Sequence, residues 1–292
     1  MTANDRQPPR GFSFALVADS HVADRPFQGR QKFARLVRQL NDTAAGMARD
    51  GHPLAFVQLL GDLKLPRDTT PAELLDDLEP PLRLIFGNND HEPARTELAR
   101  YTPGLPAIGY TAYTEQGCLF ACIDSAVAGQ HLGTLPDTQK QWLTGVLENS
   151  DTPGSRTFLF GHVPPGPPRE PVGPMLMDID ARQFLEDIFR RFKPAAAFFG
   201  HLHHPEQFEL GGVPVHVLPS SCWNFDPRRS LCSPRELIAL EQPTEAAPPA
   251  FMVVTVEPTG YSTTVVPLDM GTASHWTNRL ALDQPGASPD FI

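Results

Sequence analysis

The chain of 292 residues lacks any long apolar run and any excess of basic residues. No stretch approaches the 18 apolar residues that a membrane-spanning helix needs, so we expect no membrane segment. The formal net charge of −10 argues against broad binding to nucleic acid, which requires a basic surface. Small anionic substrates remain compatible with this charge, because bound divalent ions supply local positive charge.

Cysteine is also scarce, with four residues at positions 118, 122, 222 and 232. They have no metal-binding spacing, and no candidate ligand in the motifs described below is a Cys, which argues against a structural zinc site. The segment 1–10 is polar and does not read as a secretory signal, so we expect a cytoplasmic protein with reduced thiols. A Cys222–Cys232 disulfide is the alternative, which a reducing compartment disfavours.

Length and an apolar fraction of 40% suit one domain with a large core. We expect a flexible N-terminus over residues 1–10, a domain over 11–268 and a tail over 269–292. For the tail, an arm across a neighbouring subunit and plain disorder are both open, so a homo-oligomer is an open alternative. Two proline-rich segments, 163–174 and 223–249, are expected to be irregular and to border the site or act as lids.

Apolar residues recur in patterns that predict three helices and two groups of strands. The helices are expected at Gln31–Arg49, Pro136–Leu147 and Ala181–Phe192. Near-continuous apolar runs, typical of strands covered on both faces, lie at Phe12–Ala18, Leu54–Leu60, Leu82–Phe86, Thr157–Phe160 and Ala195–Phe199. Further strands are expected at Tyr110–Thr114, Leu119–Ile123, Val213–Leu218, Phe251–Glu257 and Tyr261–Val266. Alternation of strands and helices indicates an α/β fold, and the later strands without helices suggest a second sheet.

A short polar motif follows each of the five apolar runs. In order they are Asp19-Ser20-His21, Gly61-Asp62, Gly87-Asn88, Gly161-His162 and Gly200-His201-Leu202-His203. Ligands placed past the carboxyl ends of such strands collect along one edge of a sheet. Carboxylate, amide and imidazole groups together suit Mn, Fe, Zn or Co. Two ions about 3.5–4 Å apart can hold a bridging hydroxide and clamp a phosphoryl group. Asp62 is the natural bridging ligand, since it stands between the other motifs in the order.

This set of motifs resembles the calcineurin-like metallophosphoesterases, over about Phe12–Ser221. The resemblance implies a four-layer α/β/β/α sandwich, in which two mixed β-sheets are flanked by helices, with two divalent metal ions at its site. Mn or Fe is favoured as the metal. The implied ligands are Asp19, His21, Asp62 and His203 for one ion, and Asp62, Asn88, His162 and His201 for the other.

A second set of residues resembles one branch of that family, the class III cyclic nucleotide and glycerophosphodiester phosphodiesterases. It comprises Cys122-Ile123-Asp124-Ser125, Gly133-x-Leu135 and Gln141-Trp142-Leu143. The expected activity is therefore hydrolysis of a small-molecule phosphodiester by a metal-bridging hydroxide. A phosphomonoesterase with the same site and a non-catalytic scaffold that retains the fold are the alternatives.

One position departs from the family pattern. The family usually has His after the metal-binding Asn, where it contacts phosphate and can protonate the leaving group, but this chain has Asn89. Asn89 can donate a hydrogen bond but cannot deliver a proton at neutral pH. We therefore treat Asn89 and His91 as the candidate catalytic residues: His91 could reach in from the same loop, and a surface or capping role is the alternative.

Candidate substrate contacts are weaker and rest on proximity alone. Arg67, Arg169 and Lys64 lie on loops next to ligand residues, and one of them could bind a phosphate oxygen. His131 follows the Asp124-Ser125 stretch and could also touch substrate. Ordinary surface residues are the alternative for all four.

Overall fold

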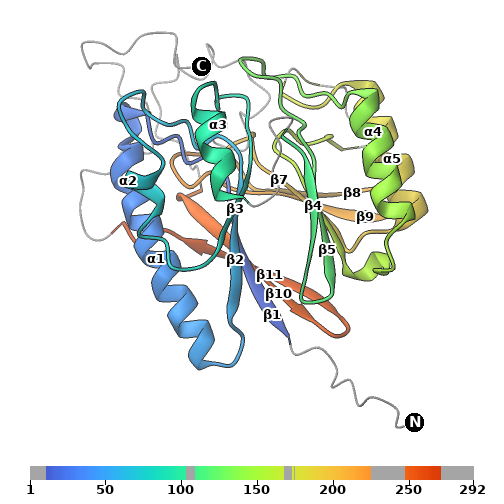
Figure 1. Cartoon of the computed structure of the whole chain (residues 1–292), viewed down its shortest axis with the longest axis horizontal. Helices are drawn as coiled ribbons and strands as arrows, with labels where there is room; N and C mark the ends of the chain where they lie inside the picture. Colours follow the sequence, from blue (N-terminus) through green and yellow to red (C-terminus); the bar gives the residue numbers. More distant parts are fainter. Residues whose placement is uncertain (1–10, 103–108, 168–172, 174, 225–246, 271–292) are drawn as a thin grey trace.

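Two mixed β-sheets packed face to face form the centre of the molecule (Figure 1). The structure is a computed structural model that describes residues 11–102, 109–167, 173, 175–224 and 247–270. One sheet has the strand order β11-β10-β1-β2-β3, and the other has the order β4-β5-β6-β7-β9-β8.

The strands and helices have the following bounds. The first sheet contains β1 (Phe12–Val17), β2 (Leu54–Leu60), β3 (Leu82–Ile85), β10 (Ala250–Glu257) and β11 (Gly260–Pro267). The second contains β4 (Thr111–Glu115), β5 (Cys118–Cys122), β6 (Thr157–Phe160), β7 (Ala196–Phe199), β8 (Glu206–Leu210) and β9 (Val213–Val217). The α-helices are α1 (Gly29–Arg49), α2 (Ala72–Leu75), α3 (Ala94–Leu98), α4 (Asp137–Glu148) and α5 (Ile179–Phe192). Short 3-10 turns lie at Arg25–Phe27, Ala99–Tyr101 and Gly154–Arg156.

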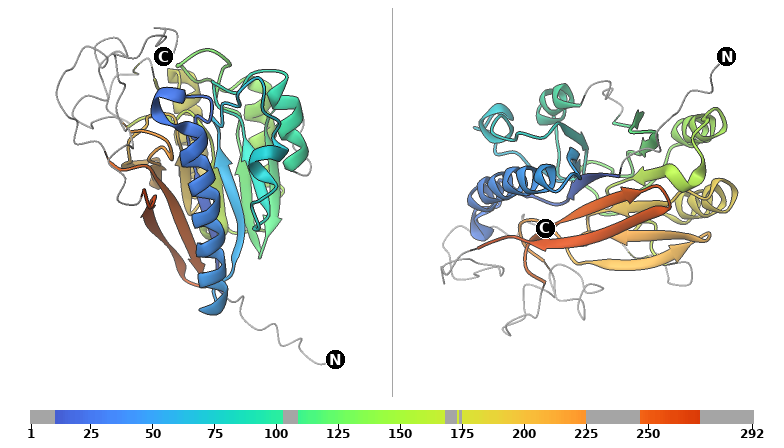
Figure 2. Two further views of the ribbon diagram at one scale, coloured as in Figure 1. Left: turned by 90° about the vertical axis from the view of Figure 1, so that its left-hand side faces the viewer. Right: turned by 90° about the horizontal axis from the view of Figure 1, so that it is seen from below.

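Three apolar clusters stack through the molecule and define its four layers. Helix α1 packs its Phe33, Leu36 and Leu40 against Ala15 and Val17 of β1. Between the sheets, aromatic side chains such as Phe14 of β1 meet Phe120 of β5, with ring centroids 5.3 Å apart. On the far side, a third cluster joins the second sheet to α4 and α5. Figure 1 accordingly shows α1, α2 and α3 on one side and α4 and α5 on the other, and Figure 2 shows the same layers from below. The predicted sandwich of two mixed sheets flanked by helices is confirmed.

The predicted elements agree with the structure to within one or two residues at each end. Helix α1 begins at Gly29 rather than Gln31, and α5 begins at Ile179 rather than Ala181 because Asp178 caps it by accepting the Ala181 backbone N–H at 2.7 Å. Pro136 precedes α4 as its N-cap residue. The prediction missed β8 and the short helices α2 and α3.

Parallel pairing brings the carboxyl ends of both sheets' central strands to one side of the molecule. Strands β1, β2 and β3 are mutually parallel, and so are β5, β6, β7 and β9. An isolated parallel bridge between Ala18 and Ser220 joins the loops that leave the two sheets. The polar motifs therefore emerge from both sheets at a common edge.

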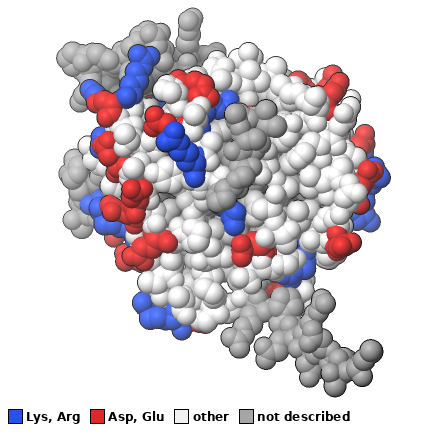
Figure 3. Space-filling model, viewed as in Figure 1, with Lys and Arg blue, Asp and Glu red and all other residues white. Residues whose placement is uncertain are grey.

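Two further observations concern membranes and surface charge. No helix within the described part of the chain has the length and apolar character needed to cross a membrane. On the face seen in Figure 3, the described acidic and basic side chains are interspersed, and basic side chains form no continuous stripe.

Candidate metal centre

The loops that follow β1 and β2 run side by side as a continuation of the parallel sheet. Asp19 N–H donates to the Gly61 carbonyl, and His21 N–H donates to the Asp62 carbonyl at 3.0 Å. Val22 and Ala23 extend this ladder to the carbonyls of Leu63 and Lys64. The backbone itself therefore places the Asp-x-His motif beside Asp62.

Most of the residues that carry the site have a left-handed backbone. The φ angles are positive at Asp19, His21, Asp62, His201 and His203, between 41° and 73°. Such angles are uncommon for residues other than glycine and cost on the order of 1–3 kcal/mol each. They persist because neighbouring hydrogen bonds fix the chain: Asp19 Oδ2, for example, accepts the His201 N–H at 2.9 Å. This strain is concentrated at one edge of the molecule and turns the side chains inward.

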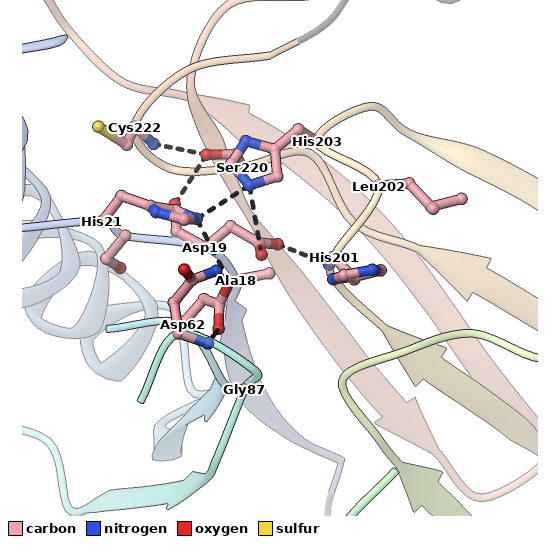
Figure 4. Close-up of polar contacts among 12 residues, drawn as sticks. Ala18, Asp19, His21, Asp62, Gly87, His201, Leu202, His203, Ser220 and Cys222 are labelled. Atoms are coloured by element: carbon pink, nitrogen blue, oxygen red, sulfur yellow. Dashed lines mark hydrogen bonds and ion pairs between the residues drawn. The ribbon is translucent and has the colours of Figure 1, made fainter. Parts of the chain in front are cut away.

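Two buried groups of three potential ligands result. Asp19, His21 and His203 form one group, and Asp62, His162 and His201 form the other, with one donor atom per residue and all atoms of a group within 4.8 Å of each other. All six residues are at most 4% exposed, which is unusual for ionisable side chains unless they have partners or hold a metal. Figure 4 shows Asp19, His21, His203 and Asp62 pointing toward one another, while Leu202 points away.

Asp62 lies between the two groups. Its Oδ2 is 3.5 Å from His21 Nε2, and its Oδ1 is 3.5 Å from His162 Nε2. Asn88 lies beside the second group, with its Oδ1 3.1 Å from His162 Nε2. One carboxylate thus faces a histidine of each group, which is the arrangement that a bridging ligand requires.

Three features of this structure fit a pair of divalent ions. Asp19 Oδ1 is buried without a hydrogen-bond partner and faces His203 Nε2 at 3.5 Å and His162 Nε2 at 4.0 Å. A Cβ at Gly87 would lie 2.0 Å from Asp62 Oδ1, so the chain approaches the site as closely as a glycine permits. The donor set of carboxylate, amide oxygen and imidazole nitrogen suits Mn, Fe, Zn or Co. Two candidate groups are present, and they do not identify the metal.

The outward-facing nitrogens of the four histidine rings have different partners. His162 Nδ1 and His203 Nδ1 lie 2.7 and 2.8 Å from the carbonyl oxygens of Leu60 and Trp223. His201 is reversed, since its Nε2 lies 3.0 Å from the His131 carbonyl, which leaves Nδ1 for the site. His21 Nδ1 instead lies 3.1 Å from Asp24 Oδ2. Such outer partners fix the tautomer and the orientation of a ligating ring.

The loop after β3 is organised by Asp90, which the sequence did not single out. The Asp90 carboxylate accepts backbone N–H groups from Asp62, Lys64 and Gly87 at 2.8–2.9 Å. Asn89 is drawn inward by the same turn: its backbone N–H donates to Asp62 Oδ1 at 2.8 Å, and its Nδ2 donates to Asp62 Oδ2 at 2.7 Å. The residue that replaces the usual histidine therefore contacts the carboxylate between the two ligand groups.

Burial and neighbouring charges shift the titration of the ligands. Burial raises the pKa of Asp19 to about 6. Burial alone would lower the pKa of His162, but the carboxylates of Asp62 and Asp19 outweigh it and raise the value to about 10. His201 has its pKa lowered to about 3 by burial and by the neighbouring His162. Protons and cations therefore compete for the same donor atoms.

The remaining candidates lie outside the two groups. His91 and Arg67 are exposed and belong to neither group. The His131 carbonyl contacts only the outer nitrogen of His201, and the two ring centroids are 6.1 Å apart. Arg169 lies outside the described residues, as do most of residues 225–249 and the tail from 271 onward. Lys64 is directed at Asp24, with Nζ 2.7 Å from Oδ1.

Other residues support the site through contacts that are distant along the chain, and the sequence predicted no such role for them. Ser125 Oγ accepts the N–H groups of His162 and Val163, at 3.1 and 2.9 Å. Ser220 Oγ donates to the Asp19 carbonyl at 2.7 Å and accepts from Cys222 N–H (Figure 4). Cys222, Cys118 and Cys122 are buried free thiols, and Cys232 lies outside the described residues.

Comparison with known sequences places these residues in context. Residues 12–205 match the model of the calcineurin-like phosphoesterase family. A probable cyclic nucleotide phosphodiesterase of Rhodococcus erythropolis is 32% identical over 241 residues, which cover 77% of this chain and 76% of that protein. A cAMP/cGMP dual specificity phosphodiesterase of Mycobacterium tuberculosis is 25% identical, with 75% of this chain and 70% of that protein covered.

Solved structures share the fold at low sequence identity. A dimetal phosphatase from Danio rerio has a TM-score of 0.55 at 15% identity and covers 87% of this chain and 99% of its own. A purple acid phosphatase from yellow lupin has a TM-score of 0.57 at 12% identity and covers 89% of this chain and 52% of its own. At these identities, the likeness concerns the fold alone.

Proposed function

Because the chain belongs to the calcineurin-like phosphoesterase family and is a phosphoester hydrolase, we propose that it hydrolyses small-molecule phosphodiesters at a centre of two divalent metal ions. Cyclic nucleotides are the favoured substrate class. The observation that carries this proposal is the position of Asp62 between two buried ligand groups, 3.5 Å from a histidine of each. The names of the relatives from Rhodococcus and Mycobacterium support the choice of cyclic diesters.

In this proposal seven residues hold the ions. Asp19, His21 and His203 would bind the first ion, His162, His201 and Asn88 would bind the second, and Asp62 would bridge them. When bound, the two ions supply positive charge for a phosphoryl group and lower the pKa of a bound water toward about 7. Burial of the ligands limits competing water, so the electrostatic attraction of the site for a phosphate is stronger than it would be at the surface.

The protein's own groups then have defined roles. Asn89 is placed to donate a hydrogen bond at the edge of the site, and its amide supplies no proton. His91, on the same loop and exposed, is the candidate donor of a proton to the leaving group. In the proposed reaction a hydroxide attacks phosphorus and no protein nucleophile is needed, so no covalent enzyme intermediate should form.

The proposal is tested by measuring hydrolysis by the metal-depleted protein, with and without added Mn²⁺. The diester substrates are 3′,5′-cAMP, 3′,5′-cGMP and bis(p-nitrophenyl) phosphate, and the monoester is p-nitrophenyl phosphate. Diesters should be cleaved only after Mn²⁺ is restored, and faster than p-nitrophenyl phosphate. Preference for the monoester would favour a phosphomonoesterase with the same site. Tight binding of two Mn²⁺ ions without hydrolysis of either class would contradict phosphoester hydrolysis and favour the binding scaffold.

A further inference from the structure

His21 differs from the other three histidines of the site in what lies behind it. The rings of His162, His201 and His203 face neutral backbone carbonyls, whereas His21 Nδ1 faces the Asp24 carboxylate at 3.1 Å. Asp24 is 2% exposed, so its charge is scarcely screened by water. Only the His21 ring therefore separates the buried carboxylate of Asp24 from the other two members of the first ligand group, Asp19 and His203.

The backbone fixes Asp24 in this position. Asp24 N–H donates to the His21 carbonyl at 2.9 Å, and the Asp24 backbone carbonyl accepts the N–H groups of both Phe27 and Gly29. Helix α1 begins directly after this turn at Gly29, where an added Cβ would lie 2.1 Å from the His21 carbonyl oxygen. The turn and the start of the helix hold the carboxylate within reach of the His21 ring.

Two further groups surround Asp24. Lys64 Nζ lies 2.7 Å from Asp24 Oδ1, and the Trp223 indole donates to Asp24 Oδ2 at 3.4 Å. Both backbone groups of Lys64 are hydrogen-bonded: its N–H donates to Asp90 Oδ1, and its carbonyl accepts the Ala23 N–H. Asp24 therefore lies between the His21 ring and its own counter-ion, Lys64.

We propose that Asp24 is a positioning residue that strengthens metal binding by the Asp19–His21–His203 group, by holding the His21 ring with Nε2 toward the metal and its proton on Nδ1. Lys64 balances the charge of this carboxylate. The inference rests on the proposed metal centre. A carboxylate behind a ligating histidine increases the ring's basicity, and loss of such a partner typically lowers metal affinity by about 10–100-fold.

Two variants that break the same ion pair distinguish this role from a structural one. Asp24→Asn removes the negative charge at nearly constant shape and should weaken one of two Mn²⁺ binding steps by about 10–100-fold. Lys64→Met removes the positive charge and leaves Asp24 in place, so the affinity of that step should be unchanged or higher. If the ion pair only stabilised the loops, both variants would weaken Mn²⁺ binding alike.

The measurement is calorimetric titration of the metal-depleted full chain with Mn²⁺ in the absence of substrate, with thermal unfolding to verify that each variant is folded. Asn88→Ala identifies the step that belongs to the second group. Should Lys64→Met fail to fold, the double variant Asp24→Asn/Lys64→Met replaces it: it restores charge balance, yet should bind Mn²⁺ as weakly as Asp24→Asn. Recovery of wild-type affinity in the double variant would overturn the proposal.

The outcome also separates this inference from the proposed function. If the wild-type chain binds no Mn²⁺, the metal centre itself is wrong. If it binds two ions and Asp24→Asn binds both with unchanged affinity, only the role of Asp24 is wrong. A weakening confined to the step that Asn88→Ala also affects would likewise overturn the assignment to the His21 group.

Discussion

Gly87 lies so close to Asp62 that a single added carbon would collide with it: a Cβ at Gly87 would be 2.0 Å from Asp62 Oδ1 and 2.4 Å from Asp62 N (Figure 4). The loop after β3 is thus pressed against the loop after β2, and Asp90 fastens the contact by accepting the N–H groups of both residues. The Asp62 carboxylate after β2 and the loop after β3 are therefore fixed relative to each other.

This contact makes Gly87→Ala a sensitive test of the site's geometry. The added methyl group must displace Asp62 or the loop, so we expect a loss of stability of about 1–3 kcal/mol, typical of an overpacked interior, together with weaker metal binding. Thermal unfolding and Mn²⁺ titration measure the two effects. Gly145→Ala is the matched control: it lies within α4, its Cβ would meet nothing within 4 Å, and it should raise stability by about 0.5–1 kcal/mol. Equal effects of the two substitutions would contradict this account of Gly87.

Asp62→Asn removes the charge between the two ligand groups while keeping the side chain's shape. The amide can face only one group with its oxygen, so we expect the number of tightly bound metal ions to fall from two per chain to no more than one. Elemental analysis of the protein after dialysis against Mn²⁺ gives this number directly. Finding two tightly bound ions in the variant, or no more than one in the wild type, would argue against Asp62 as a bridge.

Metal binding should release protons at neutral pH. His162 has a pKa raised to about 10, so its ring is protonated at pH 7 in the metal-free protein, and its Nε2 must lose that proton before it can bind a cation. The apparent affinity for Mn²⁺ should therefore rise with pH between 6 and 9. Calorimetric titrations in buffers with different ionisation enthalpies report the number of protons released. His162→Ala lacks this ring and should release fewer; a pH-independent affinity would show that His162 does not bind the metal.

Particular residues show how far sequence could anticipate this molecule and where it could not. The candidate ligand residues could be picked out because each follows an apolar run, and parallel strands bring such positions to one edge. Strand β8 was missed because its sequence, Glu206–Leu210, carries two glutamates and pairs only at the sheet's margin. The short helices α2 and α3 contain too few turns for a periodic pattern.

The roles of the residues behind the candidate ligands could not be predicted from the sequence for a different reason. Asp90, Asp24 and Ser125 act through hydrogen bonds and charges whose partners lie on loops from other strands, and no spacing rule encodes those encounters. Lys64 illustrates the ambiguity: its position beside Asp62 suggested a phosphate contact, but its ammonium group pairs with Asp24. The left-handed backbone of five ligand residues also leaves no signal in sequence, since none of them is glycine.

The contact between Asn89 and Asp62 leads to the last prediction. The Asn89 amide donates to Asp62 Oδ2 at 2.7 Å and has no proton to give to a departing alkoxide. Substrates with good leaving groups, such as nitrophenyl esters, need little protonation and should be cleaved readily, whereas alkyl phosphodiesters should be slow. Asn89→His should therefore raise kcat on alkyl diesters more than on nitrophenyl diesters, with about 10²–10⁴ as the upper limit for a general acid.

His91 provides the complementary test, because it is exposed two positions after Asn89 and belongs to neither ligand group. If His91 is the substitute acid, His91→Ala should slow alkyl diesters selectively, and the loss should disappear when Asn89→His is present. His52, which is exposed at the far end of α1, gives the control substitution His52→Ala and should leave both substrate classes unaffected. An unchanged ratio of the two rates in both Asn89→His and His91→Ala would mean that leaving-group protonation does not limit the reaction, and that Asn89 acts only as a hydrogen-bond donor to Asp62 or to the phosphate.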